Sequence, residues 1–213
     1  MKTKIGALAK FAFAISFVIV SCSPATKIVG SWKNPELGSK KYSDLYVFAM
    51  SDNFINRKTI EEDIAQILKT NGIDAQTSVN TLKPGGKLED VKPDEIVTAM
   101  QQGNNDGLLT MGLIDQTSET RYVQGTAYPM AGYGFRGYYG AYGAMAYSPG
   151  YYTTDKSYFI EIKLFDAKSG DMVWSAQSET TNPGNIESAA LDFATVVVDR
   201  MIQDGVLNVP SKK

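Results

Sequence analysis

The chain has 213 residues, with 21 Lys and Arg against 23 Asp and Glu, one cysteine and no histidine. The missing histidine excludes a Ser-His-Asp triad, a Cys-His dyad and a histidine-ligated metal site. The single cysteine excludes an intramolecular disulfide, a CxxC redox pair and a thiolate zinc cluster. A composition of 43% hydrophobic and 21% charged residues is typical of a globular protein, and the net charge of −2 provides no basic surface for nucleic acid.

The N-terminus has the pattern of a secretory signal peptide. Lys2 and Lys4 supply a positive start, and residues 11–20 form an apolar segment in which only Ser16 is polar. This segment is shorter than the roughly 20 apolar residues that a membrane-spanning helix needs. Residues 1–21 are therefore predicted to be a signal peptide that is removed.

The end of this segment, Ile19-Val20-Ser21-Cys22, resembles the bacterial lipobox. The resemblance implies that the Cys22 thiol is diacylated, that the signal is cut before it, and that the new amine is acylated, with chains such as palmitate. Two or more acyl chains anchor a protein stably at a membrane. By resemblance to enteric lipoproteins, Ser23 favours the outer membrane, with the domain facing the periplasm. The alternative is a chance cysteine after an ordinary signal peptide.

Signal removal changes the charge of the chain. It takes away three lysines and no acidic residue, so the net charge falls from −2 to −5. Such a protein is expected to be held by its acyl chains and not by a polybasic patch. Residues 22–41 are predicted to be mostly a tether, in which Ile28, Val29 and Trp32 are apolar enough to dock on the domain. Residues 209–213 are predicted to be a tail.

Residues 42–208 are predicted to form a single α/β domain. The apolar run 45–50 predicts a strand buried on both faces, and apolar residues spaced from Ile60 to Leu68 predict a helix. Thr59 and Glu62 have the spacing of a capping box for this helix. A stop at 71–72 and an alternating strand over 73–79 follow.

The second half of the domain continues the alternation. Pro93 opens a short helix that Gly103 closes, and residues 108–114 form a third strand. A hairpin is predicted over 158–164 and 172–176, and a last helix runs from Ile186 to Met201 with Gly205 as its terminator. The order is β-α-β-α-β-(insert)-β-β-α, which predicts a mixed sheet covered by helices.

This order resembles that of a family of uncharacterised bacterial envelope lipoproteins, whose members have a Gly/Tyr-rich insert. The motifs that carry the resemblance are Gly30-Ser31-Trp32-Lys33-Asn34-Pro35, Asn71-Gly72-Ile73, Asp106-Gly107-Leu108-Leu109, and Phe165-Asp166 through Gly170 to Trp174. The topology is also similar to that of the curli-secretion lipoprotein and of lipoprotein activators of penicillin-binding proteins. Neither resemblance supplies a catalytic residue, since fold does not imply function.

The insert, residues 122–152, holds nine of the twelve tyrosines, seven glycines and one charged residue, Arg136. One interpretation is an aromatic surface for a glycan, a lipid headgroup or a protein partner, because tyrosine offers a large contact area at a small entropy cost. The other is a poorly ordered loop between two strands. The residues predicted for such a ligand or partner surface are Tyr133, Phe135, Tyr138, Tyr139, Tyr142 and Tyr147.

Other motifs do not predict a catalytic centre. The GxGxxG match at 132–137 does not leave a strand and open a helix, and Gly85-Gly86-Lys87 lacks the flanking residues of a P-loop. The acidic cluster 61–63 lies off the apolar stripe of its helix and is predicted to face solvent. Trp32 and Trp174 sit beside apolar residues and are predicted to belong to the core. No cofactor or metal is expected.

Three functions therefore remain open at this point. The favoured one is a non-catalytic binding or scaffold lipoprotein of the cell envelope, with an envelope protein or a glycan as its partner. The second is an oligomeric subunit of an envelope export or assembly machine. The third is a cell-wall glycan hydrolase that acts through Asp and Glu, because paired carboxylates meet only in three dimensions.

Overall fold

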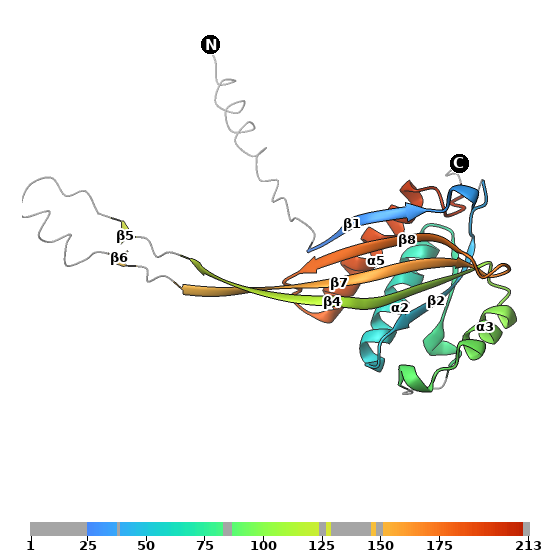
Figure 1. Cartoon of the computed structure of the whole chain (residues 1–213), viewed down its shortest axis with the longest axis horizontal. Helices are drawn as coiled ribbons and strands as arrows, with labels where there is room; N and C mark the ends of the chain where they lie inside the picture. The colour runs from blue at the N-terminus through green and yellow to red at the C-terminus, as the bar shows by residue number, and fades with distance from the viewer. Residues whose placement is uncertain are drawn as a thin grey trace, which may run out of the picture.

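The computed structural model describes residues 25–37, 39–82, 87–123, 127–128, 146–147 and 151–210. A six-stranded mixed sheet with the strand order β1-β8-β7-β4-β2-β3 forms its centre (Figure 1). β4 runs parallel to β2, and β2 runs parallel to β3, whereas the pairs β1–β8, β8–β7 and β7–β4 are antiparallel. The predicted α/β class with a mixed sheet is confirmed. The main strands are β1 Thr26–Lys33, β2 Asp44–Met50, β3 Asp74–Thr77, β4 Gly107–Val123, β7 Tyr151–Asp166 and β8 Met172–Thr181.

Helices cover both faces of the sheet, but unequally. α2 (Phe54–Thr70) and α5 (Ile186–Gln203) pack against each other on one face, and α3 (Pro93–Gln102) lies on the other (Figure 1). The apolar strand β2 explains this division, because its side chains alternate between the two faces. Leu45, Val47 and Ala49 join the large core under α2 and α5, whereas Tyr46 and Phe48 join a smaller one under α3. No helix in the described part of the chain is long and apolar enough to cross a membrane.

The middle part of the predicted tether belongs to the sheet. Residues 26–33 form β1, which pairs with β8 from Thr26 opposite Thr180 to Lys33 opposite Trp174. The alternation is interrupted by an irregularity between Ile28 and Gly30, which hides the strand pattern from a period-two search. Ile28 packs against the large core, as predicted, and the domain therefore includes one more strand than the predicted order.

β4 and β7 are much longer than the predicted strands 108–114 and 158–164, and they pair with each other as a long hairpin (Figure 1). The paired residues extend from Gly107 and Asp166 to Val123 and Tyr151, and the outer half of the hairpin is polar and rich in threonine. β2 accompanies β4 only as far as Gly112, and β8 accompanies β7 only from Ser157. The hairpin beyond these residues leaves the domain as a two-stranded ribbon. Two short strands, β5 (Ala127–Tyr128) and β6 (Ala146–Tyr147), pair with each other in the insert.

The helix boundaries correct one prediction and confirm others. α2 begins at Phe54, where the Asn53 side chain accepts a hydrogen bond from the Asn56 N–H, so the capping box at Thr59 is wrong. Thr59 lies one turn inside the helix, where its hydroxyl donates to the Ile55 carbonyl. The predicted stops at Gly72 and Gly205 are confirmed, since both glycines have positive φ angles.

Candidate functional site

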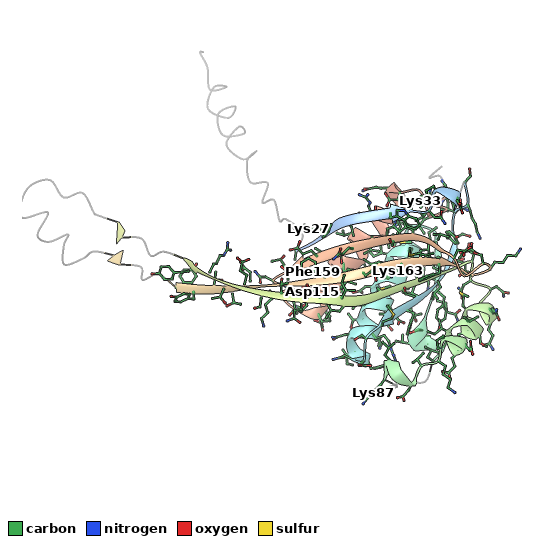
Figure 2. The ribbon with its side chains drawn as sticks, viewed as in Figure 1. Lys27, Lys33, Lys87, Asp115, Phe159 and Lys163 are labelled. Atoms are coloured by element: carbon green, nitrogen blue, oxygen red, sulfur yellow. The ribbon has the colours of Figure 1, made fainter. Side chains whose placement is uncertain are left out.

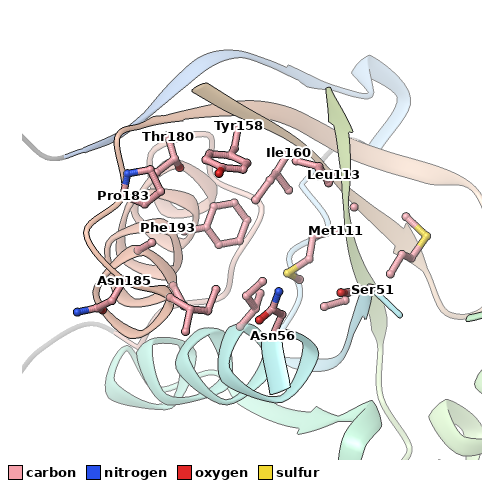
Figure 3. A pocket seen from close by; sticks show the side chains of 17 residues that line it. Ser51, Asn56, Met111, Leu113, Tyr158, Ile160, Thr180, Pro183, Asn185 and Phe193 are labelled. Atoms are coloured by element: carbon pink, nitrogen blue, oxygen red, sulfur yellow. The ribbon is translucent and has the colours of Figure 1, made fainter. Parts of the chain in front are cut away.

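A pocket of about 410 Å³ lies between α2, α5 and the sheet, at the end of the domain from which the ribbon projects (Figure 3). The side chains of Met111, Ile160 and Phe193 point toward one another across it. Leu113 also lines it, and its exposed fraction of 56% indicates that the pocket reaches the surface there. The full lining is Ala49, Met50, Ser51, Asn56, Ile60, Met111, Gly112, Leu113, Tyr158, Ile160, Thr180, Pro183, Asn185, Ile186, Ala189, Ala190 and Phe193.

The pocket exists because large side chains fill only part of the space between the helices and the sheet. In the later turns of α2, Ile64 and Leu68 are fully buried and fill the core. One and two turns earlier, the same face of α2 presents Ile60 and the polar Asn56, opposite small residues of the sheet and of α5. These small residues are Ala49, Ala189 and Ala190.

The polar groups of the pocket are few and uncharged. The Thr180 hydroxyl is hydrogen-bonded to the Thr26 hydroxyl at 2.9 Å, and the Asn185 side chain accepts the Ser188 N–H at 2.8 Å as the cap of α5. Ser51, Asn56 and Tyr158 add two hydroxyls and an amide. The lining contains no Asp, Glu, Lys or Arg. Such a pocket can hold an apolar ligand and orient it with a few hydrogen bonds.

Beside the pocket, Glu61 is buried in a way that the sequence did not indicate. Its carboxylate accepts the Ala49 N–H at 2.9 Å, the Ser78 hydroxyl at 2.6 Å and the Val79 N–H at 3.0 Å. The prediction that this acidic cluster faces solvent is therefore wrong for Glu61, which has no exposed surface. Three donors converge at the carboxyl ends of β2 and β3, and an acceptor there satisfies them.

Two further acidic residues hold the opposite end of the domain together. Asp166 accepts hydrogen bonds from the N–H groups of Lys168 and Ser169, as its predicted turn role requires, and also from the Tyr42 hydroxyl and the Lys40 ammonium. Burial alone would raise the pKa of Asp166, but the Lys40, Ser169, Tyr42 and Lys168 hydrogen bonds hold it well below its usual range. These contacts join the segment before β2 to the turn after β7.

Asp204, which follows α5, makes a similar set of contacts. It accepts the Trp174 indole N–H and the Ser31 hydroxyl, each at 2.8 Å, and the Arg200 Nε at 3.1 Å. Although burial raises the pKa of Asp204, these three donors lower it overall. Trp174 is fully buried, as predicted. The contacts fasten β1 and β8 to the end of α5, which is a structural role.

A second pocket, of about 250 Å³, lies over β1, β8, β7 and β4. Trp32, Ser175, Gln177 and Glu161 line it together with Gly30, Ser31, Ile114 and Ala176. Trp32 is 44% exposed, so its predicted place in the core is wrong. Position 32 faces away from the α2 and α5 layer, where no described helix covers this part of the sheet.

The residues predicted for function lie mostly outside the described residues. This holds for Cys22 and for Tyr133, Phe135, Tyr138, Tyr139 and Tyr142. The backbone of Tyr147 pairs with Ala127 in the β5–β6 hairpin, while its side chain is outside the described residues. In the described part of the insert, Tyr122 and Tyr152 are exposed, with their ring centroids 5.1 Å apart. No group of three or more His, Cys, Asp or Glu that could hold a metal ion occurs among the described residues.

The sequence did not predict the pocket between α2 and α5. Its walls come from six elements and the segments between them, and each wall residue by itself is an ordinary core or loop residue. The available signal was the run of small residues on α5, Ala189 and Ala190. Such a run shows where space can remain, but not whether a side chain from another element fills it.

Comparison with known proteins gives only distant structural similarity. No protein-family model matches the chain, and no curated protein matches it. A PelC dodecamer from Paraburkholderia phytofirmans is similar over 81% of this chain and 94% of its own, with 14% identity and a TM-score of 0.44. Lipoprotein GNA1162 from Neisseria meningitidis is similar over 76% of this chain and 99% of its own, with 14% identity and a TM-score of 0.39.

Proposed function

We propose that the protein is a lipid-anchored module of the bacterial cell envelope that binds an apolar ligand without catalysing a reaction on it. The observation that carries the proposal is the pocket between α2 and α5, which is apolar and reaches the surface at Leu113. The lipobox resemblance around Cys22 supports the anchor, on the outer membrane and with the domain in the periplasm. Its partners are then the membrane and the ligand of the pocket.

The chemistry of the pocket supports binding over catalysis. General acid–base work requires a titratable group within hydrogen-bond reach of the reacting atom, and Tyr158 is the one such side chain in the lining. A glycan hydrolase requires two carboxylates roughly 5–10 Å apart across a groove. The second pocket contains one carboxylate, Glu161, which pairs with Lys163 at 2.9 Å.

The anchor is tested by Cys22→Ala. We expect this variant to move from the membrane fraction to the soluble periplasmic fraction, because no acyl chain can then be attached. The measurement is fractionation followed by immunoblotting, with Ser23→Ala as the matched control. A Cys22→Ala protein that stays with the membrane contradicts the anchor.

The ligand site is tested on the soluble Cys22→Ala chain with a dansyl-labelled fatty acid methyl ester, which carries no carboxylate, as the probe. Ala189→Trp places a large ring in the pocket, and we expect it to weaken probe binding at least about tenfold, or roughly 1.4 kcal/mol. Leu191→Trp is the control on the same helix, since Leu191 is exposed and does not line the pocket. Equal affinities of the two tryptophan variants contradict the proposed site.

A second candidate function, a subunit of an oligomeric export or assembly machine, is favoured by the ribbon. Beyond Gly112 and before Ser157, neither strand of the ribbon pairs with another described strand on its outer side. Such free edges are templates for pairing with another chain. Sedimentation velocity over a range of concentrations tests this function: a ring or dimer that persists on dilution supports it, and a monomer throughout contradicts it.

A further inference from the structure

The chain enters the domain at the floor of the pocket. Thr26 in β1, Thr180 in β8 and Tyr158 in β7 lie opposite one another in a single row across the sheet. Thr180 and Tyr158 are lining residues of the pocket, and the Thr26 hydroxyl bonds directly to that of Thr180. The Thr181 N–H also donates to the Ala25 carbonyl at 2.9 Å, which fixes the position of the chain before β1.

The next row of residues places the start of β1 at the same end of the sheet as the base of the ribbon. This row crosses the sheet from the start of β1 to the base of the ribbon. Lys27 in β1 lies opposite Glu179 in β8, Glu179 opposite Phe159 in β7, and Phe159 opposite Asp115 in β4. Figure 2 shows Lys27, Phe159 and Asp115 together at this end and Lys33 toward the other. The start of β1, the base of the ribbon and the pocket therefore share one end of the domain.

From this geometry we propose that the pocket holds one of the acyl chains carried by Cys22 of the same molecule. The inference rests on the proposed anchoring of Cys22. Cys22 lies three positions before the fixed Ala25, and a segment of this length spans at most about 11 Å when extended. Neighbouring strands are about 4.8 Å apart, so Thr180 and Tyr158 are within the combined reach of this segment and an acyl chain.

The size of the pocket fits one chain. Its volume of about 410 Å³ lies near the lower end of the range for ligand pockets, about 300–1,000 Å³. This is the scale of a single acyl chain and not of the three that a lipobox cysteine is expected to carry. The two chains left outside suffice for stable anchoring, since two acyl chains hold a protein at a membrane.

The charge of the lining favours a chain attached through an amide or an ester over a free fatty acid. A fatty acid carries a carboxylate, and a buried carboxylate requires a cation or several donors. The lining offers no Lys or Arg to pair with such a carboxylate, and its hydroxyl and amide groups are all uncharged. A chain that arrives from Cys22 brings no carboxylate into the pocket.

An acyl chain held in the pocket fixes the orientation of the domain relative to the membrane. A domain that keeps one acyl chain while two remain in the bilayer is held with the pocket end toward the membrane. The exposed side chains of Met50, Leu113 and Ile55 belong to this end of the molecule. The ribbon leaves from the same end, so the acyl chain also sets the direction from which the ribbon meets the membrane.

The experiment uses the full acylated protein in isolated membranes, with methionine replaced by an analogue that carries a photoreactive diazirine. Met111 lines the pocket, whereas Met172 lies outside it at the far end of β8. After illumination and trypsin digestion, we expect the Met111 peptide to be joined to the acylated peptide 22–27. Met172 should give no such product, and Met111→Leu should remove the product at that position while the fold is kept.

The other outcomes separate this inference from the proposed function. A link from Met111 to a phospholipid leaves the apolar ligand site intact and overturns the proposed occupant. A link to peptide 22–27 of a second, isotope-labelled copy also overturns it, because the chain then comes from another molecule. If Met111 links to no lipid and the dansyl probe does not bind the Cys22→Ala chain, the apolar ligand site fails as well.

Discussion

Glu61 and Arg57 lie one turn apart on α2, and both are buried. Burial has the largest effect on the pKa of Glu61 and raises it, while the donors from Ser78, Ala49 and Val79 and the charge of Arg57 act in the opposite direction. The Arg57 guanidinium has no partner at Nε or Nη1, and it lies 5.7 Å from the centre of the Phe54 ring. Glu61 thus both satisfies buried backbone donors and offsets a buried positive charge.

Removing the Glu61 carboxylate should be costly. Glu61→Ala leaves two backbone N–H groups and one hydroxyl unpaired, each at a cost of about 1–3 kcal/mol, and it also isolates the Arg57 charge. We expect the free energy of unfolding in urea to fall by about 3 kcal/mol or more. The neighbouring Glu62→Ala, at a half-exposed side chain, should change it by less than about 0.5 kcal/mol. Equal effects of the two substitutions would show that the carboxylate contacts do not matter for stability.

Asp166 gives a prediction for the dependence of stability on pH. Its pKa is lowered in the folded protein, so its stabilising effect is present above the unfolded pKa of about 3.9 and is lost as the pH falls through the folded pKa. Asp166→Asn should therefore be less stable than the unchanged protein near neutral pH. The difference should shrink as the pH falls from about 5 toward 2. Urea unfolding at several pH values measures it, and a difference independent of pH is incompatible with the ionised Asp166 contacts.

At the scale of elements, glycines with positive φ end α2 and shape the turn after β7. Gly72 has φ +78° and Gly170 has φ +77°, so a side chain at either position is strained. The surroundings differ. A Cβ at Gly72 would lie 2.8 Å from Cδ of Pro210, whereas a Cβ at Gly170 would meet nothing within 4 Å. The end of α2 is therefore fitted closely to the segment after α5.

Substitutions at these two glycines distinguish the effect of backbone strain on the free energy of unfolding from the effect of packing. Gly170→Ala should lower the free energy of unfolding by about 1–2 kcal/mol through strain alone. Gly72→Ala should cost about 1 kcal/mol more, because the Pro210 ring must also move. Thermal and urea unfolding measure both effects, and Pro210→Ala in the Gly72→Ala background should recover the difference. No recovery would mean that Pro210 does not limit the space at Gly72.

At the scale of the whole molecule, the insert can be removed from the chain without changing the described core. Val123 and Tyr151 are paired at the end of the ribbon, so a two-residue Asn-Gly turn can replace residues 124–150 without a change of register. The residues of both cores, as far as the chain is described, lie outside this segment. The replacement should thus leave the free energy of unfolding within about 0.5 kcal/mol of the original. A larger loss would show that the insert packs on the domain.

The same replacement tests the aromatic surface predicted from Tyr133, Phe135, Tyr138, Tyr139, Tyr142 and Tyr147. Affinity purification from detergent-solubilised envelope, with and without residues 124–150, compares the recovered partners. We expect the partners of the insert to be lost while the protein stays folded and anchored. Identical partners from both proteins would mean that the insert is a spacer.

The sequence by itself determined the class of fold and most of its elements, because hydrophobic periodicity and end signals are local. The buried strand at 45–50, the apolar stripe of α5 and the stops at Gly72 and Gly205 were all visible along the chain. It also led to the predictions for Cys22 and the tyrosine-rich insert, which depend on residue type and position. A pattern of this kind needs no partner from elsewhere in the chain.

Only the tertiary structure decided the features that depend on distant partners. Edge strand β1 exists because β8 supplies its hydrogen bonds, and the threonine-rich ribbon exists because β4 and β7 extend each other. Glu61 is buried because β2 and the segment after β3 bring three donors to it. The pocket is a volume that side chains of several elements leave unfilled, and local patterns do not encode such a volume.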